Sequence, residues 1–227
     1  MQTSDSLETL SRLEKGIEAG WLVAAMLIPL LTFHESSMLG WIQMPKIFIA
    51  RSLACYLVIM MIVWWVVHPS LRSESQAFGW GRTAFRSVAG HPARYVVLAA
   101  AAIAISTIIS VAFSPVRSIG LTGIDTGWDT YGLVGIATYL VFFMAIIRHM
   151  RTADQIRRLF WVTATTASLV SIYAIVQHFG FDPFLSSPEP ALRAYGSFGN
   201  PIFLGSYLVL SLPLTIALIP VSYTHLR

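Results

Sequence analysis

The chain alternates long apolar runs with short polar connections. The apolar runs cover 19–33, 47–67, 95–113, 128–147, 159–179 and 201–220. A helix needs about 17–25 mostly apolar residues to cross a hydrocarbon core, so the pattern predicts about six membrane-spanning helices. The first run is the shortest, since Glu18 precedes it and His34 follows it. Because the runs are continuous rather than alternating, the pattern excludes a membrane β-barrel.

The segment before the first run carries a helical stripe of apolar side chains. These are Leu7, Leu10, Leu13 and Ile17. The spacing predicts an amphipathic helix over 1–18 on the inner membrane face, with Ser11 and Glu14 as a capping box. Acidic residues crowd this start and no small-residue cleavage pattern follows the apolar run, so the segment is not a cleavable signal peptide.

Composition supports the membrane assignment and excludes some chemistry. Hydrophobic residues make up 56% of the chain and charged residues 11%, whereas soluble domains have about 45–50% and about 25%. Cys55 is the only cysteine, so one chain holds no disulfide. The six histidines lack the spacing of a helical zinc site, and no Gly-x-x-x-x-Gly-Lys-Ser/Thr phosphate loop occurs. We therefore expect no metal site and no ATP hydrolysis.

Loop charge predicts the orientation of the chain. Ten basic residues lie in the N-terminal segment and in the second and fourth loops, and three lie in the other loops. Lys and Arg near span ends stay on the cytoplasmic side, so the N-terminus is predicted to be cytoplasmic. The fold class predicted from these patterns is an all-α polytopic membrane helix bundle.

The outer loops and span ends supply the candidate polar groups. Arg51 lies about one turn inside the second span, close to Lys46. Two interpretations are open: Arg51 snorkels to the outer headgroups, or it binds an anionic group such as a lipid phosphate. Asp125 and Asp129 also have two interpretations, as an acid/base pair or as a solvated turn.

The connection between the fifth and sixth spans gathers polar residues on one membrane face. They are Gln177, His178, Asp182, Glu189 and Arg193. This connection ends in a turn whose residues have structural explanations. Gly196 and Gly199 relax backbone limits, Asn200 caps the next helix and Pro201 fits its first turn.

The same region resembles the O-antigen ligase and polymerase family. The resemblance rests on a Gln-x-x-Gly-x-Asp-Pro span end at Gln177–Pro183 and an Arg-x-x-Gly-x-Phe-x-Asn-Pro turn at Arg193–Pro201. The Pro45-Lys46 start of the second span and the Tyr131-Gly132-Leu133 start of the fourth are weaker echoes. The resemblance covers the N-terminal half of such proteins.

The resemblance implies a membrane glycosyltransferase of the GT-C class. It would transfer a glycan from undecaprenyl diphosphate to an acceptor hydroxyl on a glycan, a lipid core or a protein. This would take place at the outer face of the bacterial cytoplasmic membrane, in cell-envelope polysaccharide synthesis such as that of lipopolysaccharide. No metal and no nucleotide sugar would be needed. Ligase and polymerase activity, and the identity of the sugars, stay open.

Site roles follow from this resemblance. Arg193 is the candidate catalytic residue, which would neutralise the leaving diphosphate, and a headgroup anchor is its alternative role. Lys46, Arg51, Gln177 and Asp182 are candidate substrate-binding residues.

Two departures from the family pattern weigh on these roles. Thr130 and Tyr131 stand where the family often has an arginine, which removes one expected phosphate contact. The family's later outer loop, with further Arg and a His, is not reached before Arg227, so we expect a truncated chain. Residues 221–227 resemble a translated sequencing-adapter tail, so we expect them to be artefactual. The competing hypotheses are a noncatalytic transporter or flippase half and a scaffold subunit that recognises a lipid diphosphate.

Overall fold

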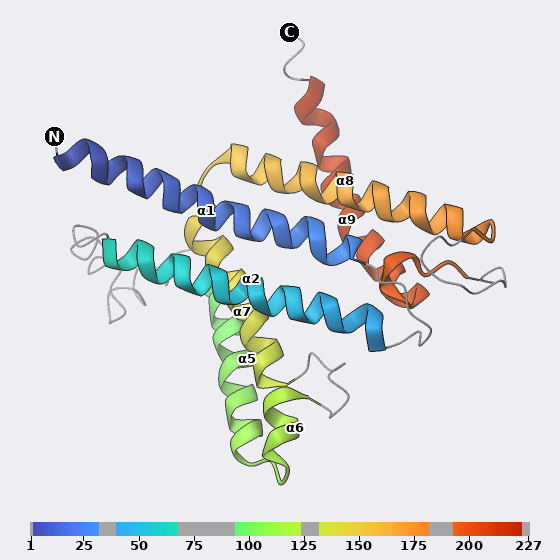
Figure 1. Cartoon of the computed structure of the whole chain (residues 1–227), viewed down its shortest axis with the longest axis horizontal. Coiled ribbons are helices and arrows are strands. Elements are labelled where there is room, and N and C mark those ends of the chain that lie inside the picture. The colour runs from blue at the N-terminus through green and yellow to red at the C-terminus, as the bar shows by residue number, and fades with distance from the viewer. Residues whose placement is uncertain (1, 32–39, 68–93, 124–131, 182–192, 224–227) are drawn as a thin grey trace. The chain divides into compact units, whose positions relative to one another are not determined.

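The computed structural model describes residues 2–31, 40–67, 94–123, 132–181 and 193–223, and all regular structure in these ranges is helical. The chain has 227 residues. The described elements, drawn in Figure 1, are α1 (Gln2–Leu30), α2 (Gly40–Val67), α5 (Arg94–Ala112), α6 (Arg117–Thr122), α7 (Leu133–His149), α8 (Ala153–His178), the 3-10 turn η1 (Gly196–Phe198) and α9 (Pro201–Tyr223).

Four of the described helices are long and apolar enough to cross a membrane. They cover Met44–Val67, Tyr95–Ala112, Ala153–His178 and Pro201–Leu218. These four match predicted spans. The predicted span 128–147 falls on α7, a shorter apolar helix of 17 residues, and the predicted span 19–33 falls on the last part of α1, which is not among the four. The regular structure of the described part is therefore all-helical, with four helices that could cross a membrane, while the count of six and the orientation stay predictions.

The amphipathic segment and the first apolar run form one continuous helix, α1. The predicted capping box at Ser11 and Glu14 is wrong, because both residues lie inside α1 and an N-cap must be non-helical. Gly16 does not interrupt the helix and allows a close crossing with α2. A Cβ at Gly16 would lie 2.5 Å from Met60 Cε, and Tyr56 donates a hydrogen bond of 3.1 Å to the Gly16 carbonyl.

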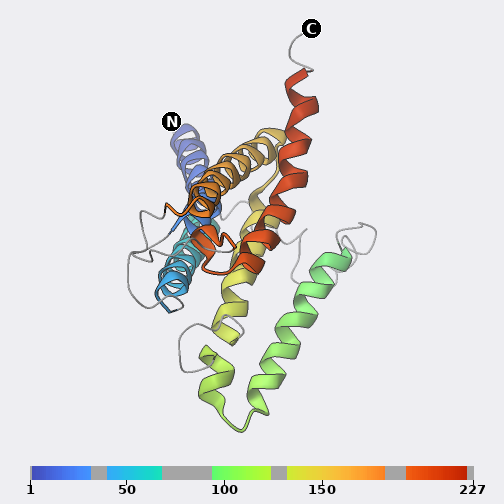
Figure 2. The ribbon, with the colours of Figure 1, turned by 90° about the vertical axis from the view of Figure 1, so that its right-hand side faces the viewer.

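The chain divides into two compact units, which we describe separately. The first comprises Met1–Ile17, Ala54–Asp125 and Asp129–Ile147, and it holds α5 and α6. These two helices lie side by side and are joined by a short turn (Figure 2). At the start of α7, a Cβ at Gly132 would lie 2.5 Å from the Gly123 nitrogen, so only glycine fits beside the end of α6.

The second unit comprises Glu18–Leu53, Thr126–Trp128 and Arg148–Arg227, and α8 packs against α9 within it. Its core is formed by Val170 and Ala174 of α8 and Leu204 of α9. Small side chains on the buried face of α8 let the neighbouring backbone approach closely, as is common between membrane helices. They are Ala164, Thr166, Ala167 and Ala174.

Helix α8 begins earlier than its apolar run predicts. The sequence predicts a span from 159, whereas the helix begins at Ala153. Thr152 and Gln155 form a reciprocal capping box there, in which the Thr152 hydroxyl accepts from the Gln155 backbone nitrogen at 3.3 Å and the Gln155 amide oxygen accepts from the Thr152 nitrogen at 3.1 Å. A cap satisfies backbone donors whatever the polarity of the first turn, so the helix extends past the apolar residues.

Candidate functional site

The C-terminal end of α8 is a Schellman motif that explains the Gln-x-x-Gly part of the sequence pattern. Gly180 has φ +83°, a left-handed conformation that glycine adopts without strain. Its nitrogen donates to the Gln177 carbonyl at 3.0 Å, and the Phe181 nitrogen donates to the Val176 carbonyl at 3.3 Å. The motif ends α8 just after Gln177, whose side chain is 2% exposed.

The buried Gln177 side chain binds the backbone of the turn before α9. Its amide oxygen accepts two hydrogen bonds, from the Tyr195 nitrogen at 2.8 Å and from the Gly196 nitrogen at 2.9 Å. Two neighbouring backbone donors therefore converge on one oxygen. The end of α8 and the start of α9 are joined by this contact across the connection between them.

The turn itself, defined here as Tyr195–Asn200, has the backbone that its glycines predict. Tyr195 is in the right-handed helical region, and Gly196 and Gly199 have φ of +54° and +68°. The Phe198 nitrogen donates to the Tyr195 carbonyl at 3.1 Å, which closes η1. Both positive φ values favour glycine over any residue with a Cβ.

Asn200 and Pro201 start α9 as the sequence predicts. The Asn200 side-chain oxygen accepts from the Ile202 nitrogen at 2.8 Å, and Pro201 is the first residue of α9. The cap satisfies one of the free donors of the first turn, and proline loses nothing there because that nitrogen needs no partner.

Two further helices contact the turn through Ser197, which is 2% exposed. Its hydroxyl donates to the Pro29 carbonyl near the end of α1. Its own carbonyl accepts from Lys46 Nζ of α2 at 2.6 Å. The Lys46 ammonium also lies 4.4 Å from the centroid of the Phe198 ring, which packs on Tyr207 at 5.0 Å between centroids.

The turn thus joins α1, α2, α8 and α9, and it holds two of the predicted substrate-binding residues, Lys46 and Gln177. Arg193, the candidate catalytic residue, is exposed just before the turn and makes no hydrogen bond or ion pair with the described residues. The neighbouring Ala194 packs against the core of the second unit.

The other predicted polar residues are placed differently or not described. Arg51 is half-buried, and its Nε atom is buried without a hydrogen-bond partner in the described part of the chain. Asp125, Asp129 and Asp182 lie outside the described residues. Within the described ranges, no group of three or more His, Cys, Asp or Glu side chains is placed to hold a metal ion.

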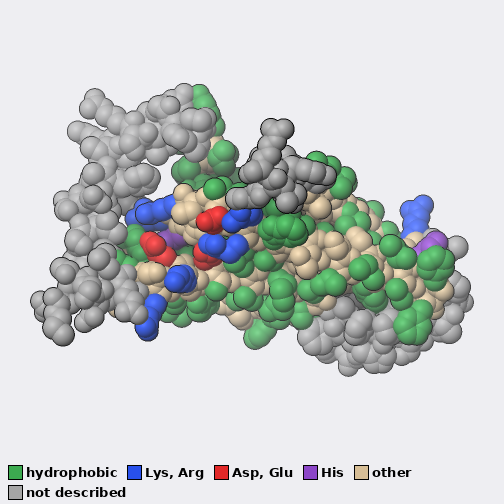
Figure 3. All heavy atoms as spheres, turned by 90° about the horizontal axis from the view of Figure 1, so that it is seen from above, with side chains coloured by type: hydrophobic (Ala, Val, Ile, Leu, Met, Phe, Trp, Pro, Cys, Tyr) green, Lys and Arg blue, Asp and Glu red, His purple; other side chains and the backbone are tan. Residues whose placement is uncertain are grey.

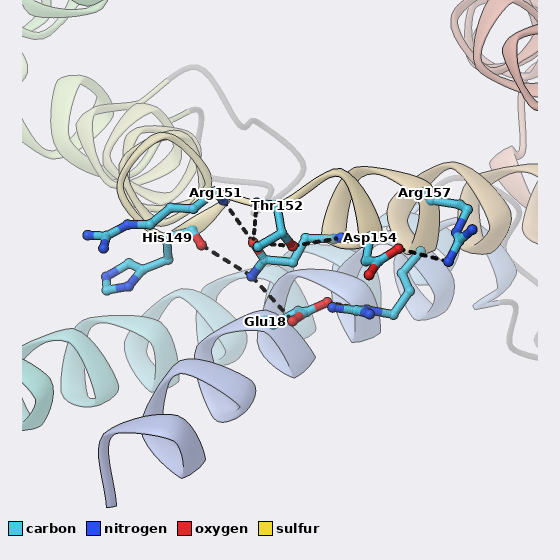
Figure 4. A network of polar contacts seen from close by, with 8 residues as sticks. Glu18, His149, Arg151, Thr152, Asp154 and Arg157 are labelled. Atoms are coloured by element: carbon cyan, nitrogen blue, oxygen red, sulfur yellow. Dashed lines mark hydrogen bonds and ion pairs between the residues drawn. The ribbon is translucent and has the colours of Figure 1, made fainter. Parts of the chain in front are cut away.

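A second polar network, which the sequence does not predict, lies at the start of α8 (Figure 4). Glu18 of α1 is 8% exposed, and its carboxylate accepts from Arg158 Nε at 2.5 Å and from Gln155 Nε2 at 3.3 Å. Gln155 Nε2 also donates to the His149 carbonyl at 3.2 Å. Figure 3 shows one group of acidic and basic side chains close together, and hydrophobic side chains over much of the remaining coloured surface.

In the sequence, the one indication of this network is Glu18 itself, an acidic residue at the edge of an apolar run. Its partners Gln155 and Arg158 come 137 and 140 residues later. No local pattern pairs residues at such a separation.

His149, just before this network and outside the four candidate spans, predicts a pH dependence. It is 5% exposed, and its burial, with the nearby charges of Arg148 and Arg151, lowers its pKa from 6.5 to about 4. Between these values the unfolded chain binds a proton that the folded chain does not. Stability is therefore lost as the pH falls from about 6.5 towards 4. We expect unfolding at pH 4.5 to require about 2–3 kcal/mol less than at pH 7 from this group.

The measurement is the free energy of unfolding in detergent as a function of pH. His149→Gln should flatten the profile in this window. Equal profiles for His149→Gln and the wild type would contradict the assignment.

No protein-family model, curated protein or solved structure matches the chain. The functional argument therefore depends on the residues and geometry of the turn. What this geometry offers chemically is an exposed guanidinium beside a backbone that four helices hold in place. Such a group binds phosphate oxygens through two parallel hydrogen bonds.

Proposed function

We propose that the chain is the N-terminal portion of a membrane glycosyltransferase similar to O-antigen ligases and polymerases. It would transfer a glycan from undecaprenyl diphosphate to an acceptor hydroxyl at the outer face of the bacterial cytoplasmic membrane. One observation carries the proposal. The Arg193–Pro201 segment, on which the resemblance rests, forms a turn held by four helices, with Arg193 exposed beside it.

The chemistry of the reaction suits this arrangement. When the glycosidic bond to the carrier breaks, negative charge develops on the leaving diphosphate. The Arg193 guanidinium would hydrogen-bond to that group and stabilise it without a metal ion. The backbone of the turn would shape the site rather than react. We assign no general base for the acceptor hydroxyl to any described residue.

A noncatalytic transporter or flippase half, or a scaffold subunit, would use the same turn to recognise a lipid diphosphate. The two classes differ in one outcome, the formation of a new glycosidic bond. Binding of the lipid alone does not separate them.

The test reconstitutes the protein, as its genome encodes it, in phosphatidylglycerol nanodiscs. Binding of undecaprenyl diphosphate is compared with binding of undecaprenyl monophosphate, and transfer of a labelled glycan from the diphosphate carrier to an acceptor is then followed. Preferential binding of the diphosphate together with transfer supports the proposal. Binding without transfer supports the noncatalytic class, and equal or absent binding of the two lipids rejects both.

A further inference from the structure

The Tyr195–Asn200 turn has the backbone of an anion-binding nest, but the protein fills it with one of its own side chains. A nest forms when successive residues take right-handed and then left-handed helical conformations, so that their N–H groups converge. Tyr195 is in the right-handed helical region, and Gly196 follows it with a φ of +54°. The oxygen that receives both N–H groups belongs to Gln177. The N–H groups of Tyr195 and Gly196 therefore already have an acceptor before any ligand arrives.

The end of α8 positions the Gln177 side chain against the turn. The Schellman motif at Gly180 ends α8 at His178, one residue after Gln177. Gln177 is 2% exposed, and burying an amide side chain is unfavourable unless its polar atoms are bound. Its oxygen is bound twice, so removing that oxygen leaves two backbone donors without their acceptor.

Lys46 is engaged by the same turn from α2. Its ammonium donates to the Ser197 carbonyl at 2.6 Å and lies over the Phe198 ring. These two contacts indicate that Lys46 supports the turn. The family resemblance had instead implied that Lys46 binds substrate. Arg193, by contrast, is exposed and makes no hydrogen bond or ion pair with the described residues.

We propose that Gln177 and Lys46 are positioning residues, which hold the Tyr195–Phe198 backbone from α8 and α2 so that Arg193 meets an anionic ligand in a fixed place. The identity of that ligand as a lipid diphosphate rests on the proposed function. The inference that Gln177 and Lys46 hold the backbone is independent of it.

Amide hydrogen exchange of the protein in nanodiscs tests the first part. Gln177→Leu keeps the volume and removes the acceptor, and we expect the amides of Tyr195 and Gly196 to exchange about tenfold faster or more. Gln177→Glu keeps an acceptor oxygen and should retain the protection. Lys46→Met should speed amide exchange at Ser197 and Phe198, and Lys46→Arg should keep these exchange rates close to those of the wild type. The helix α8 also offers a matched control, Gln155→Leu, which removes a buried glutamine at its other end and should leave the turn unchanged.

A double-mutant cycle on the binding of undecaprenyl diphosphate tests the second part. If Gln177 acts through Arg193, Gln177→Leu weakens binding about tenfold in the wild type but has little further effect in Arg193→Ala. A merely structural residue would weaken binding equally in both backgrounds.

The outcomes separate the two proposals. If the wild type does not bind the lipid, the proposed function fails, and the exchange rates still decide whether Gln177 and Lys46 hold the turn. Unchanged exchange at Tyr195 and Gly196 in a folded Gln177→Leu protein overturns the inference. Faster exchange with equal effects in both binding backgrounds also overturns the positioning role.

Discussion

Arg193→Ala is expected to lower the rate of glycan transfer about 10²–10³-fold at normal membrane abundance. The reason is that a donor aimed at charge developing in the transition state contributes about this factor. Arg193→Lys should retain part of the activity, because an ammonium keeps the charge but loses the two-pronged geometry of guanidinium. The measurement is transfer of a labelled glycan in nanodiscs, normalised to the amount of folded protein.

Arg117→Ala is the matched control for this prediction. Arg117 is also exposed and is predicted on the same membrane face, but it begins the short helix α6 in the other unit. Its replacement should leave transfer within about twofold, since surface substitutions rarely change more. Wild-type transfer by Arg193→Ala would end the catalytic assignment and favour the headgroup-anchor role.

The parts of the site that local chemistry determines could be predicted from the sequence. The Asn200 cap and the first-turn Pro201 each depend on residues within two positions along the chain. The positive φ values of Gly196 and Gly199 follow from the type of residue at those positions. In contrast, Lys46 and Ser197 are 151 residues apart, and nothing in either neighbourhood indicates that one carbonyl accepts from that ammonium.

The fold shows the same division between local and distant effects. Continuous apolar runs predict α2, α5, α8 and α9, because membrane solvation acts on each helix separately. Errors arise where a helix extends beyond its apolar run. Helix α1 joins a polar and an apolar segment, and α8 starts in the charged segment before its run because a capping box satisfies its first turn.

The polar network at the start of α8 gives two adjacent arginines different roles. Arg158 binds Glu18, whose side chain is 10% exposed, whereas Arg157 binds Asp154, whose side chain is 66% exposed. The two guanidiniums make contacts of similar length, 2.5 Å and 2.8 Å to a carboxylate oxygen. They therefore differ mainly in how much water reaches the carboxylate.

Arg158→Leu is expected to lower the stability of the protein more than Arg157→Leu does, because only Arg158 pairs with a buried carboxylate. Removing Arg158 leaves Gln155 as the remaining partner of the buried Glu18 carboxylate within the described part of this network, and an uncompensated buried charge is costly. Unfolding by sodium dodecyl sulfate titration measures both variants. Glu18→Gln in the Arg158→Leu background should recover most of the loss, since it removes the stranded charge. Equal stability of the two arginine variants would contradict this prediction, because it would show that the Arg158–Glu18 pair stabilises the protein no more than the exposed Arg157–Asp154 pair does.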